Sequence, residues 1–466
     1  MRWDVIFLNA GNKGKILKLF MLGGVIFSMH FGSSSMIWPM TWGKESGSSV
    51  IMAFGGIFLT ALLFPLLGYV ALSKGNGTFY SIVCRISKPM ALIFCGTTML
   101  VLGPLFVIPR MSAAAWDAFV QISGFANTSF VPGFIFSIIY YIIVYWFISK
   151  RSQTINKIGK ILLPVLLVSV SAIISKGILS PISPVLPPVY SEPAFAYGFR
   201  EGYATLELPC ALVYATIIIS ELKHRGLEGK NLEKNLYIVG ILGIGILSLV
   251  HFGHMVVGSH AAGVYKDLKY ASLYAAVVVN LWGQAGGIIF NIALLFASFT
   301  AAIGISVSTA SYFEEITNSK ISYAKGAAGT LFVSMLISSM GLSAIVEFIT
   351  PMLNVVYPSA IVMTLYYSLL GQIESKPAVF ASYKYAFTAS FAWGIVEGIQ
   401  GYMNMFGARS NMLDMFISKM PLSEYGLGWI CTAAIFAALG FIARNLRQGS
   451  PKYACGDIQK AQAQSK

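Results

Sequence analysis

The feature that most constrains this chain is the recurrence of apolar segments long enough to cross a lipid bilayer. Of its 466 residues, 56% are hydrophobic and 11% are charged, whereas a soluble domain carries about a quarter charged residues. A membrane-spanning helix needs about 20 apolar residues. We therefore predict an all-α integral membrane protein with about twelve transmembrane helices. The predicted spans are residues 17–41, 50–73, 89–115, 131–149, 158–177, 196–221, 235–257, 284–311, 325–341, 345–370, 381–400 and 424–443.

The basic residues indicate how these helices are oriented. If the N-terminus is placed inside, the inner loops hold 24 of the 32 Lys and Arg residues and the outer loops hold seven, with Arg110 inside a span. Inner loops of membrane proteins are enriched in Lys and Arg. Both termini are therefore predicted to be cytoplasmic, and the net charge of +14 reflects topology rather than a nucleic-acid partner.

The first span is interrupted near its middle. Gly32 is followed by Ser33, Ser34 and Ser35, and Pro39 stands four residues after the last serine. Gly lowers helix stability, and Ser side chains compete for backbone hydrogen bonds. Backbone groups freed inside a membrane are tolerated only where protein or a wet cavity satisfies them. The segment therefore predicts half of a small-molecule binding site.

The sixth span contains a second interruption of the same kind. Within residues 198–209, an apolar segment is interrupted by Gly202, Thr205, Glu207 and Pro209. The two breaks lie five spans apart in the order of the chain, so the two broken helices enter the membrane from opposite sides. Discontinuous helices at matching positions of two inverted halves are typical of the midplane binding site of a secondary transporter. We therefore predict such a transporter.

The eighth span is rich in small and hydroxyl-bearing residues. Residues 297–306 include Ser298, Thr300 and Ser306. Small residues permit close packing of membrane helices. Hydroxyl and carbonyl oxygens are also ligands for hard cations, which include sodium. Both interpretations remain open at this point.

Several motifs occur in the order and spacing of one known family. They are Phe31-Gly32 with Ile37-Trp38-Pro39, residues 103–110, residues 158–164, Glu201-Gly202-Tyr203 with Thr205 and Glu207, Pro351 with Tyr357-Pro358 and residues 360–362, and Pro421-Leu422 with residues 426–429. The chain thereby resembles the branched-chain amino acid carrier II proteins (the LIVCS family of the amino acid–polyamine–cation superfamily) over nearly its whole length. The resemblance implies a LeuT-like core of two inverted five-helix repeats, with discontinuous helices 1 and 6 and two extra C-terminal helices. It also implies cation-driven uptake of leucine, isoleucine and valine, with methionine left open and sodium as the usual cation.

The resemblance also implies where a substrate binds. Its carboxylate meets backbone N–H groups of residues 32–35, where the helix dipole favours negative charge. Its ammonium meets carbonyl oxygens around residues 202–205, and its aliphatic side chain lies against apolar groups. The substrate-binding candidates are Phe31, Gly32, Ser33, Ser34, Ser35, Leu105, Gly202, Tyr203, Thr205 and Glu207.

The coupling ion is expected to bind between the first and eighth spans. The candidate sodium ligands implied by the resemblance are Ser28, Phe31, Ala297 and Thr300. The chain departs from the family at Ser35, where relatives commonly have Asn, and at Ala301, where they commonly have a second Thr. Apart from sodium or a proton as the coupling ion, no cofactor or metal is expected.

Three ionisable residues inside the spans are candidates for gating or coupling, because a buried charge is costly in lipid. Glu207 either orients the second break, receives the ammonium or a proton, or bonds freed N–H groups. Arg110 either closes a gate with an acid such as Asp117 or Glu201, or extends to the membrane surface. His30 either takes part in proton coupling or packs as a neutral side chain.

Other classes of function have less support in the sequence. His251, His254 and His260 lack an identifiable fourth metal ligand. An enzyme is not expected, because no His-Glu-x-x-His motif and no nucleophile elbow in a plausible setting occur. A channel would need charge rings or filter repeats. A transport-dead amino acid sensor with the same fold stays open.

The predicted organisation follows from the topology and the resemblance. Residues 1–16 are predicted to form a cytoplasmic N-terminal segment, and residues 17–370 a ten-helix core of two repeats (17–177 and 196–370). Residues 371–443 are predicted to form two additional helices, and residues 444–466 a cytoplasmic tail. The predicted location is the bacterial cytoplasmic (inner) membrane. The expected partners are the lipid bilayer, an amino acid substrate and a coupling cation, with no obligate protein partner.

Overall fold

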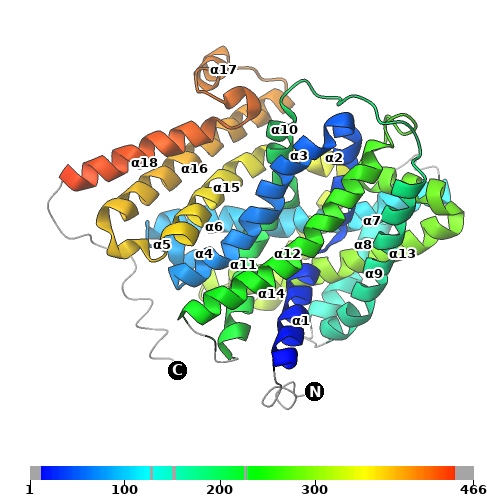
Figure 1. The fold of residues 1–466 in the computed structure, drawn as a ribbon, viewed down its shortest axis with the longest axis horizontal. Coiled ribbons are helices and arrows are strands. Elements are labelled where there is room, and N and C mark those ends of the chain that lie inside the picture. Colours follow the sequence, from blue (N-terminus) through cyan, green and yellow to red (C-terminus); the bar gives the residue numbers. More distant parts are fainter. Residues whose placement is uncertain (1–11, 126–129, 150–153, 225–226, 228, 447–466) are drawn as a thin grey trace.

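The computed structural model describes residues 12–125, 130–149, 154–224, 227 and 229–446, and these residues form a bundle of helices (Figure 1). The first part of the chain contains α1 (Asn12–His30), α2 (Ser33–Ser46), η2 (Gly47–Ser49), α3 (Val50–Ile57), η3 (Phe58–Leu63), α4 (Phe64–Gly75), α5 (Phe79–Cys84), α6 (Lys88–Leu100), η4 (Val101–Leu105), α7 (Val107–Ser123), α8 (Phe130–Ser149) and α9 (Thr154–Leu179). The second part contains α10 (Ala194–Glu201), η5 (Gly202–Thr205), α11 (Glu207–His224), α12 (Gly229–Ser259), α13 (Tyr270–Ile316), α14 (Tyr323–Ser338), α15 (Leu342–Leu370), η6 (Ile373–Ser375), α16 (Pro377–Met405), α17 (Asn411–Ser418), η7 (Ser423–Tyr425) and α18 (Gly428–Leu446).

Each of the twelve predicted spans falls on one of these helices or on two or three consecutive helical segments. Among the described residues, seven helices are long and apolar enough to cross a membrane, or eight if the bent pair α10–α11 is one span. The remaining predicted spans lie on helices that are shorter or less apolar, namely α1, α9, α14 and α16. The architecture is therefore that of a multi-pass helical membrane protein, as predicted.

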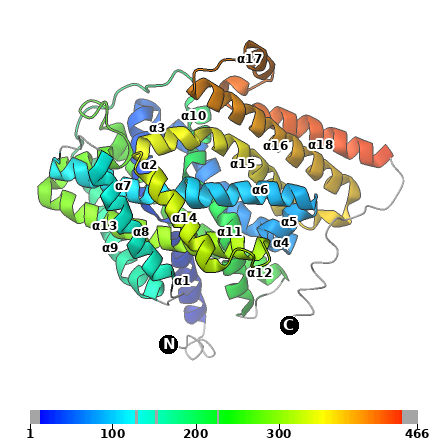
Figure 2. The same cartoon turned by 180° about the vertical axis from the view of Figure 1, so that it is seen from behind.

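The helices have two distinct ends and one flanking pair. The α2–α3 junction, the beginning of α10 and α17 lie at one end of the bundle, whereas the beginnings of α1 and α12 lie at the other (Figure 1). Helices α16 and α18 pack against each other, and α16 packs on α15 (Figures 1 and 2). The last two long helices therefore flank the rest of the bundle on one side.

Helices α2 and α12 approach each other so closely that only glycine fits at two contacts. A Cβ atom on Gly43 would lie 2.0 Å from the carbonyl oxygen of Met255, and one on Gly258 would lie 2.1 Å from that of Met40. Small residues permit such backbone contact between membrane helices. The half-helix α2 is thus held firmly against α12.

Two spans are broken at the positions that the sequence predicts. Helix α1 ends at His30 and α2 begins at Ser33, with Gly32 extended between them (φ −99°, ψ −174°). Leu206 adopts a left-handed conformation (φ 58°) between η5 and α11. This conformation is strained for a residue with a side chain, and the two halves of that span differ in direction by 47°. Both breaks leave helix ends inside the bundle.

The segment before α7 is also irregular. Segment η4 has π-helical bonding, contains Pro104, and includes Gly103 in a non-helical conformation (φ −90°, ψ −111°). A Cβ atom on Gly103 would lie 2.7 Å from the Cγ2 atom of Thr309 on α13. Glycine therefore allows the chain to pass close to α13, after which α7 begins beside the two breaks.

Candidate functional site at the two helix breaks

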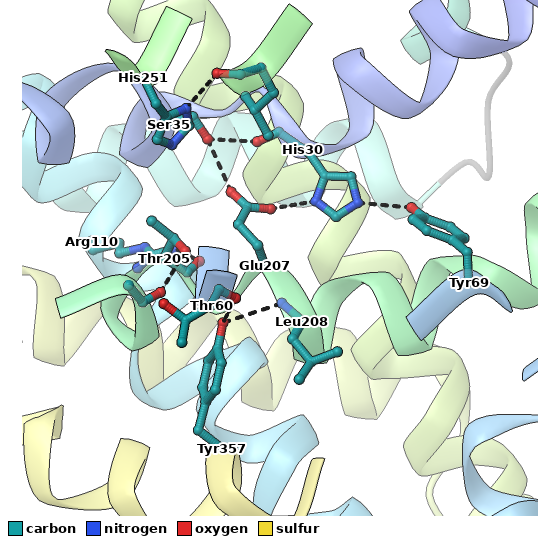
Figure 3. Close-up of polar contacts among 12 residues, drawn as sticks. His30, Ser35, Thr60, Tyr69, Arg110, Thr205, Glu207, Leu208, His251 and Tyr357 are labelled. Carbon is teal, nitrogen blue, oxygen red and sulfur yellow. Dashed lines mark hydrogen bonds and ion pairs between the residues drawn. The ribbon is translucent and has the colours of Figure 1, made fainter. Parts of the chain in front are cut away.

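The side chains of His30 and Glu207 contact each other where the broken helices meet (Figure 3). His30 is the last residue of α1 and Glu207 is the first of α11. The Nδ1 atom of His30 contacts Oε2 of Glu207, and its Nε2 atom lies 2.8 Å from the hydroxyl oxygen of Tyr69 on α4. All three side chains are buried. The contact therefore joins the first break to the second inside the bundle.

Ser35 on α2 joins the same group of contacts. Its hydroxyl oxygen lies 2.7 Å from the carbonyl oxygen of His30 and 3.1 Å from Oε1 of Glu207, so one proton serves two acceptors. The amide of Gly32 also donates to the His30 carbonyl at 3.0 Å. The break frees this carbonyl from helical bonding, and the protein satisfies it internally, as membrane burial requires.

Arg110 on α7 satisfies the second break. Its guanidinium donates to the carbonyl oxygens of Ala204 and Thr205, at 2.7 Å and 3.1 Å. The guanidinium carbon also lies 4.4 Å from the ring centre of Phe106 and 5.3 Å from that of Trp38. Planar, weakly hydrated guanidinium suits such a buried, aromatic position. Arg110 thus holds the end of η5 in place.

In this conformation, among the described residues, Arg110 pairs with neither Asp117 nor Glu201, and a gate that closes in another state stays a prediction. The side chain is 2% exposed, so it does not extend to the membrane surface. The carboxylate of Asp117 accepts from the amide of Leu342 at 3.3 Å instead of pairing with Arg110. The physical reason is that η5 leaves buried carbonyl oxygens without helical partners, and a forked donor satisfies two of them at once.

Tyr357 on α15 supports the second break from another side. Its hydroxyl donates to the carbonyl oxygen of Thr60 at 3.3 Å and accepts from the amide of Leu208 at 3.4 Å (Figure 3). Leu208 lies in the first turn of α11, where amides have no helical partner. The ring of Tyr357 also stacks on that of Tyr203, with centres 4.3 Å apart. No local sequence pattern indicates these partners, because they lie on distant segments.

A small pocket lies between the two breaks. Its volume is about 30 Å³, which holds about one water molecule and not an amino acid. The predicted substrate-binding residues that line it are Gly32, Ser34, Ser35, Thr205 and Glu207. The rest of the lining consists of Met29, His30, Val107, Arg110, Met111, Cys210, Tyr214, Ala301 and Ile305. In this conformation the candidate site is nearly closed.

The other predicted substrate-binding residues lie outside this pocket lining. They are Phe31, Ser33, Leu105, Gly202 and Tyr203. Phe31 stacks on Phe27, with ring centres 4.7 Å apart, and the hydroxyl of Tyr203 accepts from the indole N–H of Trp429 at 3.2 Å. Apolar side chains of α7 and α13 line the pocket in their place. The sequence carried no signal for this apolar wall.

Of the candidate sodium ligands, Ser28 lies on α1, Phe31 lies in the break after it, and Ala297 and Thr300 lie on α13. The hydroxyl of Ser28 is exposed and donates to the carbonyl of Val25 at 2.9 Å. The hydroxyl of Thr300 donates to the carbonyl of Phe296 at 2.7 Å. Each hydroxyl thus donates its proton to a carbonyl of its own helix, and its oxygen can still coordinate a cation. Phe31 and Ala297 are buried, and the sodium site stays a prediction.

The three histidines of α12 and its following turn do not converge. His251 bonds the carbonyl of Leu247 at 2.8 Å, and His254 bonds the hydroxyl of Tyr274 at 2.6 Å. His260 bonds the carbonyl of Ser183 at 2.8 Å. Within the residues that the structure describes, no cluster of three or more His, Cys, Asp or Glu side chains is arranged to hold a metal ion.

Comparison with solved structures identifies the fold. The chain is similar to the nucleobase-cation-symport-1 family transporter Mhp1 in a closed conformation with bromovinylhydantoin bound, with a TM-score of 0.60, 13% sequence identity and 94% of each chain covered. It is also similar to MhsT in complex with L-phenylalanine, with a TM-score of 0.52 and 15% identity, covering 91% of this chain and 98% of MhsT. The fold is therefore that of the LeuT-like transporters, which confirms the predicted fold class.

Comparison with protein families then identifies the family. The model of the branched-chain amino acid transport proteins matches residues 15–447, and the chain belongs to this family of transporters rather than to a family of enzymes. The branched-chain amino acid permease BrnQ of Escherichia coli is 26% identical over 426 residues, covering 90% of this chain and 94% of BrnQ. The permease BraB of Bacillus subtilis is 25% identical, covering 90% and 94%. The transport system 2 carrier protein of Pseudomonas aeruginosa is 26% identical, covering 94% and 98%.

Proposed function

We propose that this chain imports leucine, isoleucine and valine across the bacterial cytoplasmic membrane by cation symport, using alternating access. The observation that carries the proposal is the pocket between the two breaks, where the N-terminus of α2 and the carboxylate of Glu207 lie side by side. The names of the Escherichia coli, Bacillus subtilis and Pseudomonas aeruginosa relatives support branched-chain amino acids as the substrate class.

Each end of an α-amino acid has a complementary group at this pocket. The carboxylate binds at the first turn of α2, near Ser34 and Ser35, because amides there lack helical partners and the helix dipole favours an anion. The ammonium binds the carboxylate of Glu207. The carbonyls of residues 204 and 205 accept from Arg110. Glu207 is a charged acceptor, and its bonds to His30 and Ser35 can be exchanged for bonds to the ammonium.

The aliphatic side chain of the substrate lies against α7 and α13. Val107, Met111, Ala301 and Ile305 line that side of the pocket and are apolar. A pocket of about 30 Å³ cannot hold a leucine side chain, so these helices separate in the state that binds substrate. Such rearrangement around a fixed midplane site is the usual mode of inverted-repeat transporters.

The remaining parts of the proposal concern topology and coupling. The distribution of Lys and Arg supports cytoplasmic termini. Residues 17–370 are proposed as the inverted-repeat core, with two further helices within residues 371–443. The coupling cation is sodium, bound by Ser28, Phe31, Ala297 and Thr300, and a proton is the alternative.

Uptake by purified protein in liposomes tests the proposal. We expect labelled leucine to accumulate when an inward sodium gradient is imposed, and isoleucine and valine to compete. Accumulation with a proton gradient alone would identify the proton as the coupling ion. Absence of gradient-driven uptake of every neutral amino acid would overturn the proposal, and stoichiometric leucine binding without uptake would indicate a sensor.

A further inference from the structure

A second cavity lies on the opposite side of α7 from the pocket between the breaks. Its volume is about 110 Å³. Arg110 and Met111 line the pocket, whereas Ser112, Trp116 and Asp117 line the second cavity. Helix α8 and the α14–α15 turn form its other walls. In Figure 2, α7, α8 and α14 lie together, and these three helices pack against one another. We call this space the α7–α8 cavity.

Asp117 places a carboxylate in the α7–α8 cavity with no cationic partner. It lies on α7, in the segment Lys88–Ser123 that is long and apolar enough to cross a membrane. It is the single ionisable side chain among the residues that line the cavity. Within the part of the chain that the structure describes, its carboxylate accepts one hydrogen bond, from the amide of Leu342 at 3.3 Å. Among the residues that the structure describes, no Lys, Arg or His side chain forms an ion pair with it. Asp117 is partly buried, and a single amide compensates a carboxylate at such a site only in part.

Trp116 lines the same cavity and carries an unused donor. Its indole Nε1 atom is buried and has no hydrogen-bond acceptor among the described residues. The centre of its ring lies 5.4 Å from that of Phe136 on α8 and 5.6 Å from that of Phe119 on α7. A Cβ atom on Gly133 would lie 3.1 Å from the indole nitrogen, so glycine keeps this wall clear. Buried donors without acceptors are rare in proteins.

We propose that the α7–α8 cavity is a second small-molecule site, which binds the ammonium group of a small aliphatic amine or amino acid through Asp117. The cavity volume sets the size of the ligand, because a cavity of about 150 Å³ holds benzene. A ligand of about five or six heavy atoms therefore fits. Aromatic walls such as Trp116 and Phe136 also favour a cation.

The ammonium group can belong to a simple amine or to an amino acid, and a bond to Trp116 distinguishes these two kinds of ligand. A simple amine, such as isobutylamine, uses Asp117 alone. A zwitterion of similar size, such as alanine, also offers a carboxylate to the indole N–H of Trp116. The site is separate from the proposed substrate pocket, so it stands whether or not the chain transports branched-chain amino acids.

The test is titration calorimetry of the purified full chain with isobutylamine and with alanine. We expect at least one of them to bind, and Asp117→Asn to weaken that binding by about tenfold or more, since a charge-assisted bond is lost. Trp116→Phe is expected to weaken alanine binding and to leave isobutylamine binding unchanged. Asp414→Asn, in α17 where Asp414 accepts from Gln400, is the matched control and is expected to bind normally.

Thermal unfolding of each variant shows whether it is folded. Competition with excess leucine shows whether the probe occupies the pocket between the two breaks instead of the α7–α8 cavity. If Asp117→Asn does not fold, Ser339→Leu, which fills the cavity from the turn after α14, replaces it and is expected to abolish binding of the probe. Binding that survives these substitutions, binding that leucine displaces completely, or no binding of either probe would overturn the proposal.

Discussion

His30 and Glu207, which are 177 positions apart in the sequence, touch across both helix breaks. Tyr69 bonds the other nitrogen of the imidazole, and Ser35 bonds the other oxygen of the carboxylate. A closed group of this kind is stable in a membrane because each polar atom has a partner. Substrate entry therefore has to replace some of these bonds with bonds to the ammonium of the amino acid.

Replacement of Glu207 by Gln should abolish most transport. The change keeps the shape of the side chain but removes the charge that binds the substrate ammonium. We expect the initial rate of leucine uptake in liposomes to fall by about 10- to 100-fold, as for the loss of a charge-assisted bond. Glu397→Gln on α16 is the matched control, because an amide oxygen can still accept from Trp393. Equal uptake by Glu207→Gln and wild type would contradict the assignment.

Replacement of Arg110 by Lys should destabilise the second break. Lysine replaces the two guanidinium nitrogens that donate separately to Ala204 and Thr205 by a single nitrogen, and it loses the planar group over the rings of Phe106 and Trp38, so these bonds are weakened. We expect a loss of about 1–3 kcal/mol of stability, measured as a lower thermal midpoint. Arg200→Lys, which alters a partly exposed pair with Glu192, should change the midpoint much less. Equal effects of the two substitutions would argue against a special role for Arg110.

Shortening Ile305 should change the substrate preference. Ile305 lines the pocket, so Ile305→Ala enlarges the space for the substrate side chain. We expect the preference for leucine over phenylalanine to fall by about tenfold, since a pocket discriminates by about 1–3 kcal/mol per methylene group. Competition of labelled leucine uptake measures this ratio. Ile303→Ala, which is buried on the same helix outside the pocket, controls for loss of packing. The same shift in both variants would show that the wall is assigned wrongly.

Lys44 should hold the loop between α12 and α13 in place. Its ammonium donates to the carbonyl oxygens of residues 265, 266 and 268, at 3.3, 2.8 and 2.6 Å. The next residue, Glu45, pairs with Lys269 at 2.8 Å. Lys44→Met leaves these carbonyls without a donor, so we expect faster amide hydrogen exchange in residues 260–269. Lys266→Met, at an exposed position, should leave exchange unchanged. Unaltered exchange in Lys44→Met would contradict this role.

Local sequence chemistry was sufficient to predict the two breaks. Gly32 with three serines, and Gly202 with Thr205 and Glu207, disfavour a continuous helix over a few residues, and the structure has its irregular backbone there. The same local signals do not report distance in space. They gave no indication that His30 contacts Glu207, or that Arg110 bonds the carbonyls after Gly202.

The pocket wall was harder to predict for a related reason. In a membrane protein almost every helix face is apolar, so hydropathy does not separate residues that face a pocket from those that face lipid or another helix. Ala301 and Ile305 on α13 line the pocket, whereas Tyr203 packs on Tyr357 behind it. Only the way in which the helices pack together decides between these positions.

The most direct test of the account is a density map of this protein with leucine bound. The account predicts leucine between the two breaks, with its carboxylate at the first turn of α2 and its ammonium within hydrogen-bond distance of Glu207. It also predicts that α7 and α13 lie further apart than in the nearly closed pocket. Leucine bound elsewhere, or bound with no contact to Glu207, would contradict it.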